Sequence, residues 1–155
     1  MAPPPASALV RPVRRTDAAA WLAMRRELWP GGSETEHAEE IEEFFSGRAR
    51  EPLAVLIAED PEGNAVGFVE LSIRPSAHEC RTDRVGFLEG WFVAPEARRR
   101  SVGRHLVAAA EDWARSQGCS ELASDSEAGN TASAKAHAAA GFADVGLVRC
   151  YRKDL

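Results

Sequence analysis

The spacing of apolar residues changes along the chain, and each change predicts a different kind of element. Apolar residues three or four positions apart indicate helices, whereas alternating or short continuous apolar runs indicate strands. Ser33 and Glu36 have the spacing of a capping box that opens a helix, and Ala38 begins the expected apolar stripe of that helix. In chain order, the pattern predicts a strand at 9–14, helices at 16–29 and 33–47, strands at 53–60, 65–74 and 85–93, a helix at 102–117, a strand at 121–125, a helix at 130–140 and a bent strand or hairpin at 142–153.

This order of elements indicates the fold class. Helices alternate with strands, and a tight turn from Pro61 to Asn64 joins two strands directly, so the sequence predicts an α/β (α+β) fold with a mixed sheet. No internal repeat or linker interrupts the pattern, and 155 residues suit one domain. We expect a single domain over residues 9–155. Residues 1–8 are rich in proline and alanine and are expected to form a disordered tail.

Composition argues against several classes of protein. No apolar run approaches the ~20 residues of a membrane span, and the first residues lack the basic start and apolar stretch of a signal peptide. We therefore expect a cytoplasmic protein with no membrane partner. The net charge of −5 disfavours nucleic acid as a partner and favours a cationic ligand. The three cysteines and four histidines lack the spacing of a zinc site, so no metal is expected.

The clearest chemical signal lies at the start of the helix predicted at 102–117. The turn that leads into it reads Arg-Arg-Arg-Ser-Val-Gly over residues 98–103. A basic turn with small residues at a helix start can bind an anion, because free backbone N–H groups and the helix dipole point at the ligand. Arginines add charge-assisted hydrogen bonds to phosphate. The alternative is a solvated basic turn without a ligand.

The same stretch resembles the acyl-CoA motif of the GCN5-related N-acetyltransferases, the GNAT superfamily. That motif, Gln/Arg-x-x-Gly-x-Gly/Ala, matches residues 98–103, with Ser101 in place of the first glycine. Downstream, Asn130, the Ala-His pair at 136–137 and the Gly-Phe pair at 141–142 resemble a helix and turn of the same family. The order of predicted elements also matches, so the resemblance covers nearly the whole chain.

This resemblance implies a GNAT-like fold, with a mixed, mostly antiparallel central sheet flanked by about four helices. It also implies acetyl-CoA as co-substrate. The cofactor would contact the end of the apolar strand, the arginine-rich turn and the starts of the two helices that follow. The residues assigned to acetyl-CoA on this basis are Phe92, Val93, Arg98, Arg99, Arg100, Ser101, Val102, Gly103, Arg104, Asn130 and Ser133.

Five short segments resemble one branch of the superfamily, the bacterial aminoglycoside 6′-N-acetyltransferases. They lie at 28–32, 72–74, 87–90, 123–125 and 130–133. This resemblance implies acetylation of the 6′-amino group of aminoglycosides, antibiotic resistance and a homodimer. One alternative is a GNAT enzyme for another amine, such as a polyamine, a protein N-terminus or a lysine. The other is a non-catalytic acyl-CoA-binding module.

Glu89 is the strongest candidate for catalysis, because it is the one acid in an otherwise apolar strand. Burying a carboxylate is unfavourable unless it is paired or used, and an ammonium must lose a proton before its nitrogen can attack a thioester. Strand alternation predicts that Glu89 shares a face with Phe87 and Trp91, barring a bulge at Gly90. The resemblance also implies an acid at this position. The alternative is an acid paired with an internal arginine such as Arg74.

Asp125 and Trp29 are further candidates for the substrate site that contains Glu89. Asp125 ends a predicted strand, where it can act as a second anion, directly or through water; the alternative is a turn or cap residue. Trp29 ends the first predicted helix beside Pro30 and Gly31, where it can form a wall of the cleft. The alternative for Trp29 is a tryptophan of the core.

Three possibilities remain for the acid that reprotonates the CoA thiolate. Asn130 and His137 are seven residues apart and so share a helix face, which puts His137 along the cofactor if Asn130 holds the pantetheine amide. Many family members carry tyrosine at this point of the motif, and Tyr151, the only tyrosine, is the rival. The thiolate can also leave without a dedicated acid. No cysteine lies in either motif, so a covalent acetyl-enzyme is not expected.

Overall fold

A five-stranded sheet in the order β1-β2-β3-β4-β5 forms the centre of the molecule. The computed structural model describes residues 8–155. All neighbouring strands are antiparallel except β4 and β5, which are parallel, so the predicted mixed, mostly antiparallel sheet is confirmed. The strands are β1 (Leu9–Pro12), β2 (Ala54–Glu59), β3 (Ala65–Arg74), β4 (Val85–Val93) and β5 (Leu122–Ser124).

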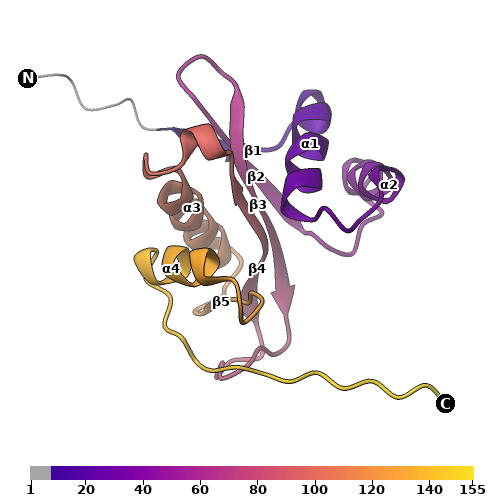
Figure 1. Cartoon of the computed structure of the whole chain (residues 1–155), viewed down its shortest axis with the longest axis vertical. Coiled ribbons are helices and arrows are strands. Elements are labelled where there is room, and N and C mark those ends of the chain that lie inside the picture. The colour runs from indigo at the N-terminus through magenta and orange to yellow at the C-terminus, as the bar shows by residue number, and fades with distance from the viewer. Residues whose placement is uncertain (1–7) are drawn as a thin grey trace, which may run out of the picture.

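Helices cover both faces of this sheet (Figure 1). Helices α1 (Ala18–Leu28) and α2 (Glu34–Phe45) lie over one face, and α3 (Val102–Ser116) and α4 (Thr131–Ala139) lie over the other. Short 3₁₀ turns, η1 (Arg15–Asp17) and η2 (Pro95–Ala97), precede α1 and α3. No helix within residues 8–155 is long and apolar enough to cross a membrane.

Two apolar clusters attach the helices to the sheet. On the α3 face, Leu106, Val107 and Ala110 pack in one buried cluster with Val69 and Leu71 of β3. On the opposite face, residues of α1 and α2 form a second cluster with residues of β2, β3 and β4. That second cluster contains Trp21, Met24, Ile41, Val55, Ile57, Phe68 and Phe92.

Helix α2 begins with the predicted capping box. The backbone N–H of Glu36 donates to Ser33 Oγ at 3.0 Å, and the Glu36 carboxylate accepts from the Ser33 N–H. The predicted stripe is partly wrong, however, because His37 is buried and Ala38 is exposed. His37 Nε2 lies 3.2 Å from the carbonyl oxygen of Trp29, so the face of α2 that carries His37 packs toward the end of α1.

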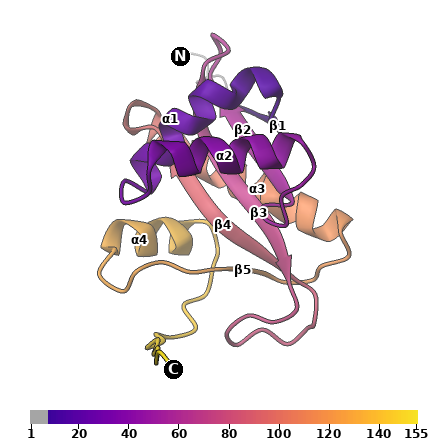
Figure 2. The same cartoon turned by 90° about the vertical axis from the view of Figure 1, so that its right-hand side faces the viewer.

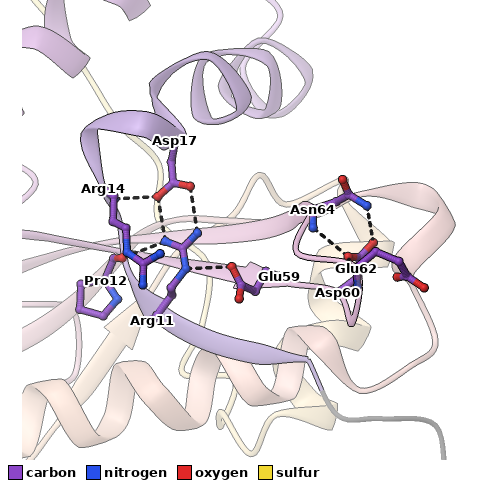
Figure 3. Close-up of polar contacts among 8 residues, drawn as sticks. All are labelled: Arg11, Pro12, Arg14, Asp17, Glu59, Asp60, Glu62 and Asn64. Atoms are coloured by element: carbon purple, nitrogen blue, oxygen red, sulfur yellow. Dashed lines mark hydrogen bonds and ion pairs between the residues drawn. The ribbon is translucent and has the colours of Figure 1, made fainter.

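Helix α1 starts at Ala18 rather than at a Thr16 cap, because an ion-pair cluster holds the preceding turn (Figure 3). Arg11 donates to both oxygens of Asp17, at 2.8 and 2.9 Å, and its Nε donates to Glu59. The hydrogen bonds from Arg11 lower the pKa of Asp17. Figure 3 also shows the predicted turn between β2 and β3, where the N–H groups of Glu62 and Asn64 donate to Asp60.

The C-terminal segment departs most from the sequence prediction. Residues 142–155 form no strand or hairpin, and after Phe142 they run away from the sheet and from α4 (Figure 2). Phe142 itself packs against the α3-side core. At the other end, the expected tail at 1–8 lies outside the described residues except Ala8, which contacts the same core.

Candidate active site

Strand β4 contains a bulge at Glu89. Across the β3–β4 pair, Glu70 lies opposite Gly90, but the next residue, Leu71, lies opposite Leu88. Glu89 is therefore the extra residue that has no partner on β3. A bulge re-aims the side chain it contains and bends the strand, and bulges are frequent next to active sites.

The bulge corrects the face assignment that alternation predicted. Leu88 and Trp91, three positions apart, both pack in the cluster under α3. Glu89 points to the opposite face, where Arg74 lies over the Phe87 ring at 3.5 Å and bonds to Glu89. Glu89 therefore shares a face with Phe87, as expected, but not with Trp91. The extra residue reverses the alternation for the rest of the strand.

Glu89 and Arg74 form a bidentate ion pair. Arg74 Nε donates to Glu89 Oε1 at 3.0 Å, and Nη2 donates to Oε2 at 2.7 Å. Hydrogen bonding to Glu89, together with the charges of Glu51 and Asp125, raises the pKa of Arg74. The pairing with Arg74 that the sequence left as an alternative is thus present. The Glu89 side chain remains 21% exposed, so a ligand can still reach it.

An open pocket of about 240 Å³ lies beside this pair. Trp29 and Glu89, two of the residues predicted for the substrate site, both line it. Asp125 does not line the pocket; it is exposed and lies near enough to Arg74 to raise the pKa of that guanidinium. The pocket is lined by Arg25, Trp29, Glu40, Glu51, Pro52, Glu70 and Glu89.

Of the lining residues, the sequence predicted only Trp29 and Glu89, and Glu70 is the most deeply buried acid among those it missed. It is only 3% exposed, and desolvation raises its pKa to about 7, although the nearby Arg25 charge and a hydrogen bond from Trp21 oppose that shift. The sequence does contain a signal for Glu70, because it is the single acid in the apolar run Val-Gly-Phe-Val-Glu-Leu at 66–71. The same signal had identified Glu89.

At the start of α3, the arginine-rich turn has the backbone of an anion site. Arg99 and Ser101 adopt the left-handed conformation, with φ of 63° and 65°. The N–H groups of residues 102–104 have no backbone partner within residues 8–155, because a helix start leaves them free. Gly103 brings the helix close to β4, since a Cβ there would lie 3.2 Å from the Trp91 ring. This turn suits a phosphate group.

The four arginines of the turn have different environments. Arg98 Nε donates to the Val93 carbonyl at 2.8 Å, so this side chain closes the turn onto the end of β4. Arg104 donates to Ser101 Oγ at 2.8 Å. Arg99 and Arg100 are exposed at the surface. The latter two are therefore the arginines most available to a phosphate.

Between Glu89 and this turn, β4 and β5 are not paired among the described residues, and this unpaired stretch is called the gap between β4 and β5. Among residues 8–155, β5 pairs only with residues 86–88 of β4, so the edge of β4 that faces β5 has no strand partner from Glu89 onward. The side chain of Phe92 is buried in the α1-side core, and its carbonyl oxygen faces β3, where a Cβ added to Gly67 would lie 2.7 Å from it. An extended pantetheine arm fits such an edge, because its amides can replace the missing strand hydrogen bonds.

His137 of α4 closes the far side of the gap. Its Nδ1 lies 2.8 Å from the Ser133 carbonyl, which can only accept, so Nδ1 carries a hydrogen. Its Nε2 lies 2.8 Å from Ser124 Oγ at the end of β5, and its ring contacts that of Trp91 edge-on. The rival acid, Tyr151, is 88% exposed in the C-terminal segment and is not brought to this place.

Asn130, the other predicted contact on α4, caps that helix. Its Oδ1 accepts the Ser133 N–H at 3.0 Å. The carbonyl oxygen of the side chain is therefore engaged, and the amide NH₂ is the group that remains to donate to a ligand.

The turn, the open edge of β4 and the bulge together define the class of protein. A family model described as the acetyltransferase (GNAT) family matches residues 19–142. The chain belongs to this family.

The relatives belong to a narrower group. The chain is 60% identical over 149 residues to an aminoglycoside N(6′)-acetyltransferase type 1 of Klebsiella aerogenes, covering 96% of this chain and 98% of the relative. A relative with the same description from Serratia marcescens is 40% identical, covering 88% and 92%. The solved structure of AAC(6′)-Iy with the bisubstrate analog CoA-S-monomethyl-acetylneamine is 38% identical, covers 96% and 99%, and has a TM-score of 0.86. A structure of AAC(6′)-Iy with CoA is 37% identical over all of both chains, with a TM-score of 0.87.

Proposed function

We propose that this protein is an aminoglycoside 6′-N-acetyltransferase that uses acetyl-CoA and confers resistance to these antibiotics. The proposal rests chiefly on the 60% identity, over nearly the full length of both chains, to a relative of that description. The acidic pocket beside the unpaired edge of β4 supports it, because an aminoglycoside carries several ammonium groups. We assign its place of action to the cytoplasm.

The reaction is a direct transfer. The deprotonated amine nitrogen attacks the thioester carbonyl carbon, a C–N bond forms, and the C–S bond breaks to release the CoA thiolate. The ammonium proton leaves to a base, and the thiolate takes a proton from an acid or from water. An acetylated amine no longer carries a positive charge, so the modified drug loses one of its attractions to anionic targets.

Glu89 is assigned as the group that attracts the substrate ammonium and accepts its proton. Arg74 holds both oxygens of this carboxylate, but an ionised carboxylate has about four acceptor sites, so an ammonium or a water molecule can bind as well. Asp125, exposed near Arg74, is assigned as a second anion for other amines of the drug. Trp29 forms a wall of the same pocket.

Acetyl-CoA is assigned to the gap between β4 and β5, with its phosphates at the start of α3. Arg99, Arg100 and the free N–H groups of residues 102–104 would hold the pyrophosphate. Asn130 would donate to pantetheine. His137 is assigned as the source of the proton for the thiolate, and that proton would leave from Nε2, which lies beside Ser124, because the hydrogen on Nδ1 is held by the Ser133 carbonyl.

We further propose that the chain acts as a homodimer built on its C-terminal segment. Many apolar side chains exposed on one segment are unusual for a monomer, and β5 has no second neighbour within residues 8–155. A second copy of the chain can pair with this segment as an added strand. The exposed apolar residues of the segment are Val145, Leu147, Val148, Tyr151 and Leu155.

A thiol-release assay tests the function. Purified protein is given acetyl-CoA with kanamycin, tobramycin, spermidine or a lysine peptide. We expect rapid release with the two drugs and acetylation of the 6′-nitrogen, seen by NMR. Equal or faster release with spermidine or peptide would assign another substrate. Binding of acetyl-CoA without release on any amine would indicate a non-catalytic module.

A further inference from the structure

Two buried residues of opposite charge line the pocket beside Glu89. Glu70 of β3 and Arg25 of α1 are 3% and 6% exposed, and Arg25 Nε lies 3.2 Å from Glu70 Oε2. The N–H of that nitrogen does not point at the oxygen, and it has no hydrogen-bond partner among the described residues. Trp21 Nε1 donates to the same oxygen at 3.3 Å, and Arg25 Nη2 bonds to Glu40 of α2.

The Arg25 guanidinium lies near the rings of two tryptophans. Its carbon is 5.9 Å from the centre of the Trp21 ring and 5.1 Å from that of Trp29. His37 of α2 stacks on Trp29, with ring centres 6.4 Å apart and planes 22° apart. The indole of Trp29 is thus contacted by a cation from α1, the helix that Trp29 itself caps, and by an aromatic ring from α2.

Trp29 in turn closes over the bulge. A Cβ added to Gly90 would lie 2.6 Å from Trp29 Cη2, so the indole fills the place where a side chain would be. Gly90 follows the bulge residue Glu89 and lies opposite Glu70 in the β3–β4 pair. Glu70, Arg25, Trp29 and Gly90 therefore form a closed series of contacts around one wall of the pocket.

Stability alone does not explain such a pair. Burying two charges is unfavourable by several kcal/mol, and apolar residues of similar volume are often at least as stable in their place. Arg25 is the only cation in a lining that contains Glu40, Glu51, Glu70 and Glu89. A planar guanidinium can meet a carboxylate at its edge and indoles at its faces, which a lysine or an apolar residue cannot do.

We propose that Arg25 and Glu70 are positioning residues, whose buried pair holds the indole of Trp29 over Gly90 and thereby sets the affinity of the pocket for the amine substrate. This inference rests on the proposed function, since the substrate is taken to be an aminoglycoside. The pair acts on the wall beside Glu89 and not on the proposed acetyl-CoA site, which is assigned to the edge of β4 that faces β5 and to the start of α3.

Arg25→Met is the first test. It removes the charge and the planar head but keeps most of the volume. Displacing a positioning group by about 1 Å can reduce catalysis by as much as ~100-fold, so we expect kcat/KM for kanamycin to fall about 10- to 100-fold. The change should appear in the KM for kanamycin, while the KM for acetyl-CoA stays at the wild-type value. Arg25→Lys, which restores the charge without the plane, should recover only part of the loss.

Arg26→Met is the matched control. Arg26 is the next residue of α1, and it also forms an ion pair, at 3.3 Å with Glu34, but its side chain is 56% exposed and it does not line the pocket. We expect kinetics close to wild type. If Arg25 has only a structural role, Arg25→Met will lower the melting temperature and the active fraction but leave both KM values unchanged, and the proposal is then wrong.

Calorimetry separates this proposal from the proposed function. The dissociation constant of kanamycin is measured on wild type and on Arg25→Met without acetyl-CoA, so no turnover is needed. Weaker binding by the variant supports the positioning role even if the wild type acetylates nothing. Equal binding contradicts it. If Arg25→Met does not fold, the double variant Arg25→Met/Glu70→Leu removes both charges and is measured in the same way.

Discussion

Arg74 holds both oxygens of Glu89, with Nε 3.0 Å from Oε1 and Nη2 2.7 Å from Oε2. The pair spans adjacent strands at the point where the bulge leaves Glu89 without a strand partner. A bidentate arginine fixes the direction of a carboxylate. The mobility of Glu89 is therefore limited, and its remaining acceptor sites face the pocket that also contains Trp29.

Glu89→Gln tests this carboxylate as the proton acceptor. The change keeps the volume and one oxygen for Arg74, so the fold should survive. We expect kcat to fall by ~100-fold or more, because loss of a general base typically has that effect, and the acidic limb of the kcat–pH profile to flatten. Steady-state kinetics with tobramycin between pH 5 and 9 measure both.

The control for this substitution is Glu62→Gln, which makes the same change in the exposed turn between β2 and β3. If Glu89→Gln changes only the KM, Glu89 attracts the cation without accepting its proton. A normal kcat with an unchanged pH profile would overturn its role and make Asp125 the leading base.

The double variant Arg99→Met/Arg100→Met tests whether the arginine-rich turn binds the phosphates of acetyl-CoA. Arg98 is a poorer choice, because it bonds to the Val93 carbonyl and its loss would also open the turn. We expect the KM for acetyl-CoA to rise about tenfold, equivalent to roughly 1.4 kcal/mol, with the KM for the drug nearly unchanged. Arg115→Met, at the other end of α3, should change neither. An unchanged acetyl-CoA KM in the double variant would contradict the assignment.

Ser101→Gly should stabilise the protein. Ser101 has φ of 65°, a left-handed conformation that is unfavourable by roughly 1 kcal/mol for a residue with a Cβ and free of that strain for glycine. Urea unfolding should show a gain of up to about this size. Ser46→Gly is the control, because φ there is −83° and glycine can only lose stability. A large rise in the acetyl-CoA KM of Ser101→Gly would show that the hydroxyl binds the cofactor.

Glu70 makes stability depend on pH. Burial raises its pKa from 4.5 to about 7 in the folded chain, so between these values the folded state keeps a proton that the unfolded state releases. This stabilisation is complete below pH 4.5 and is lost as the pH rises through 7. Its full size would be about 3 kcal/mol.

Unfolding in urea at pH 5 and pH 8 measures this contribution of Glu70. The free energy of unfolding of wild type should fall more between the two values than that of Glu70→Gln, which cannot titrate. An equal change in the free energy of unfolding of the two proteins would show that Glu70 does not change protonation between pH 5 and pH 8.

Removal of residues 144–155 tests the homodimer. The deletion leaves Phe142 in the core but removes the exposed apolar side chains, so we expect a folded monomer by sedimentation equilibrium. Leu147→Lys should also shift the protein from dimer toward monomer. Leu53→Lys, at an exposed leucine before β2, is the control and should not. A wild-type monomer, or a deletion variant that stays dimeric, would contradict the proposal.

Local sequence was sufficient for much of the fold. Strands β3 and β4 have the predicted limits, 65–74 and 85–93, because long apolar runs ended by turn residues specify a buried strand. The capping box of α2 and the helix after the arginine-rich turn were also predicted correctly. In each case the determining residues lie within a few positions of one another, so no distant contact is needed.

The substrate side of the site depended on tertiary structure. Alternation placed Glu89 with Trp91, but the β3–β4 register adds a residue at Glu89 and turns Trp91 to the other face. The contact between Arg25 and Glu70 joins a helix to a strand 45 positions away, and no local pattern pairs them.

The sequence by itself determined the elements up to residue 140, their order, the arginine-rich turn and the choice of Glu89 as a candidate acid. Only the tertiary structure decided which acids share the pocket, that Arg74 binds Glu89, and that the C-terminal segment leaves the sheet. The physical reason is the separation along the chain over which each kind of interaction acts. Helix and turn signals act over three or four neighbours, whereas register, buried ion pairs and strand partners are fixed by free energies summed over contacts between distant segments.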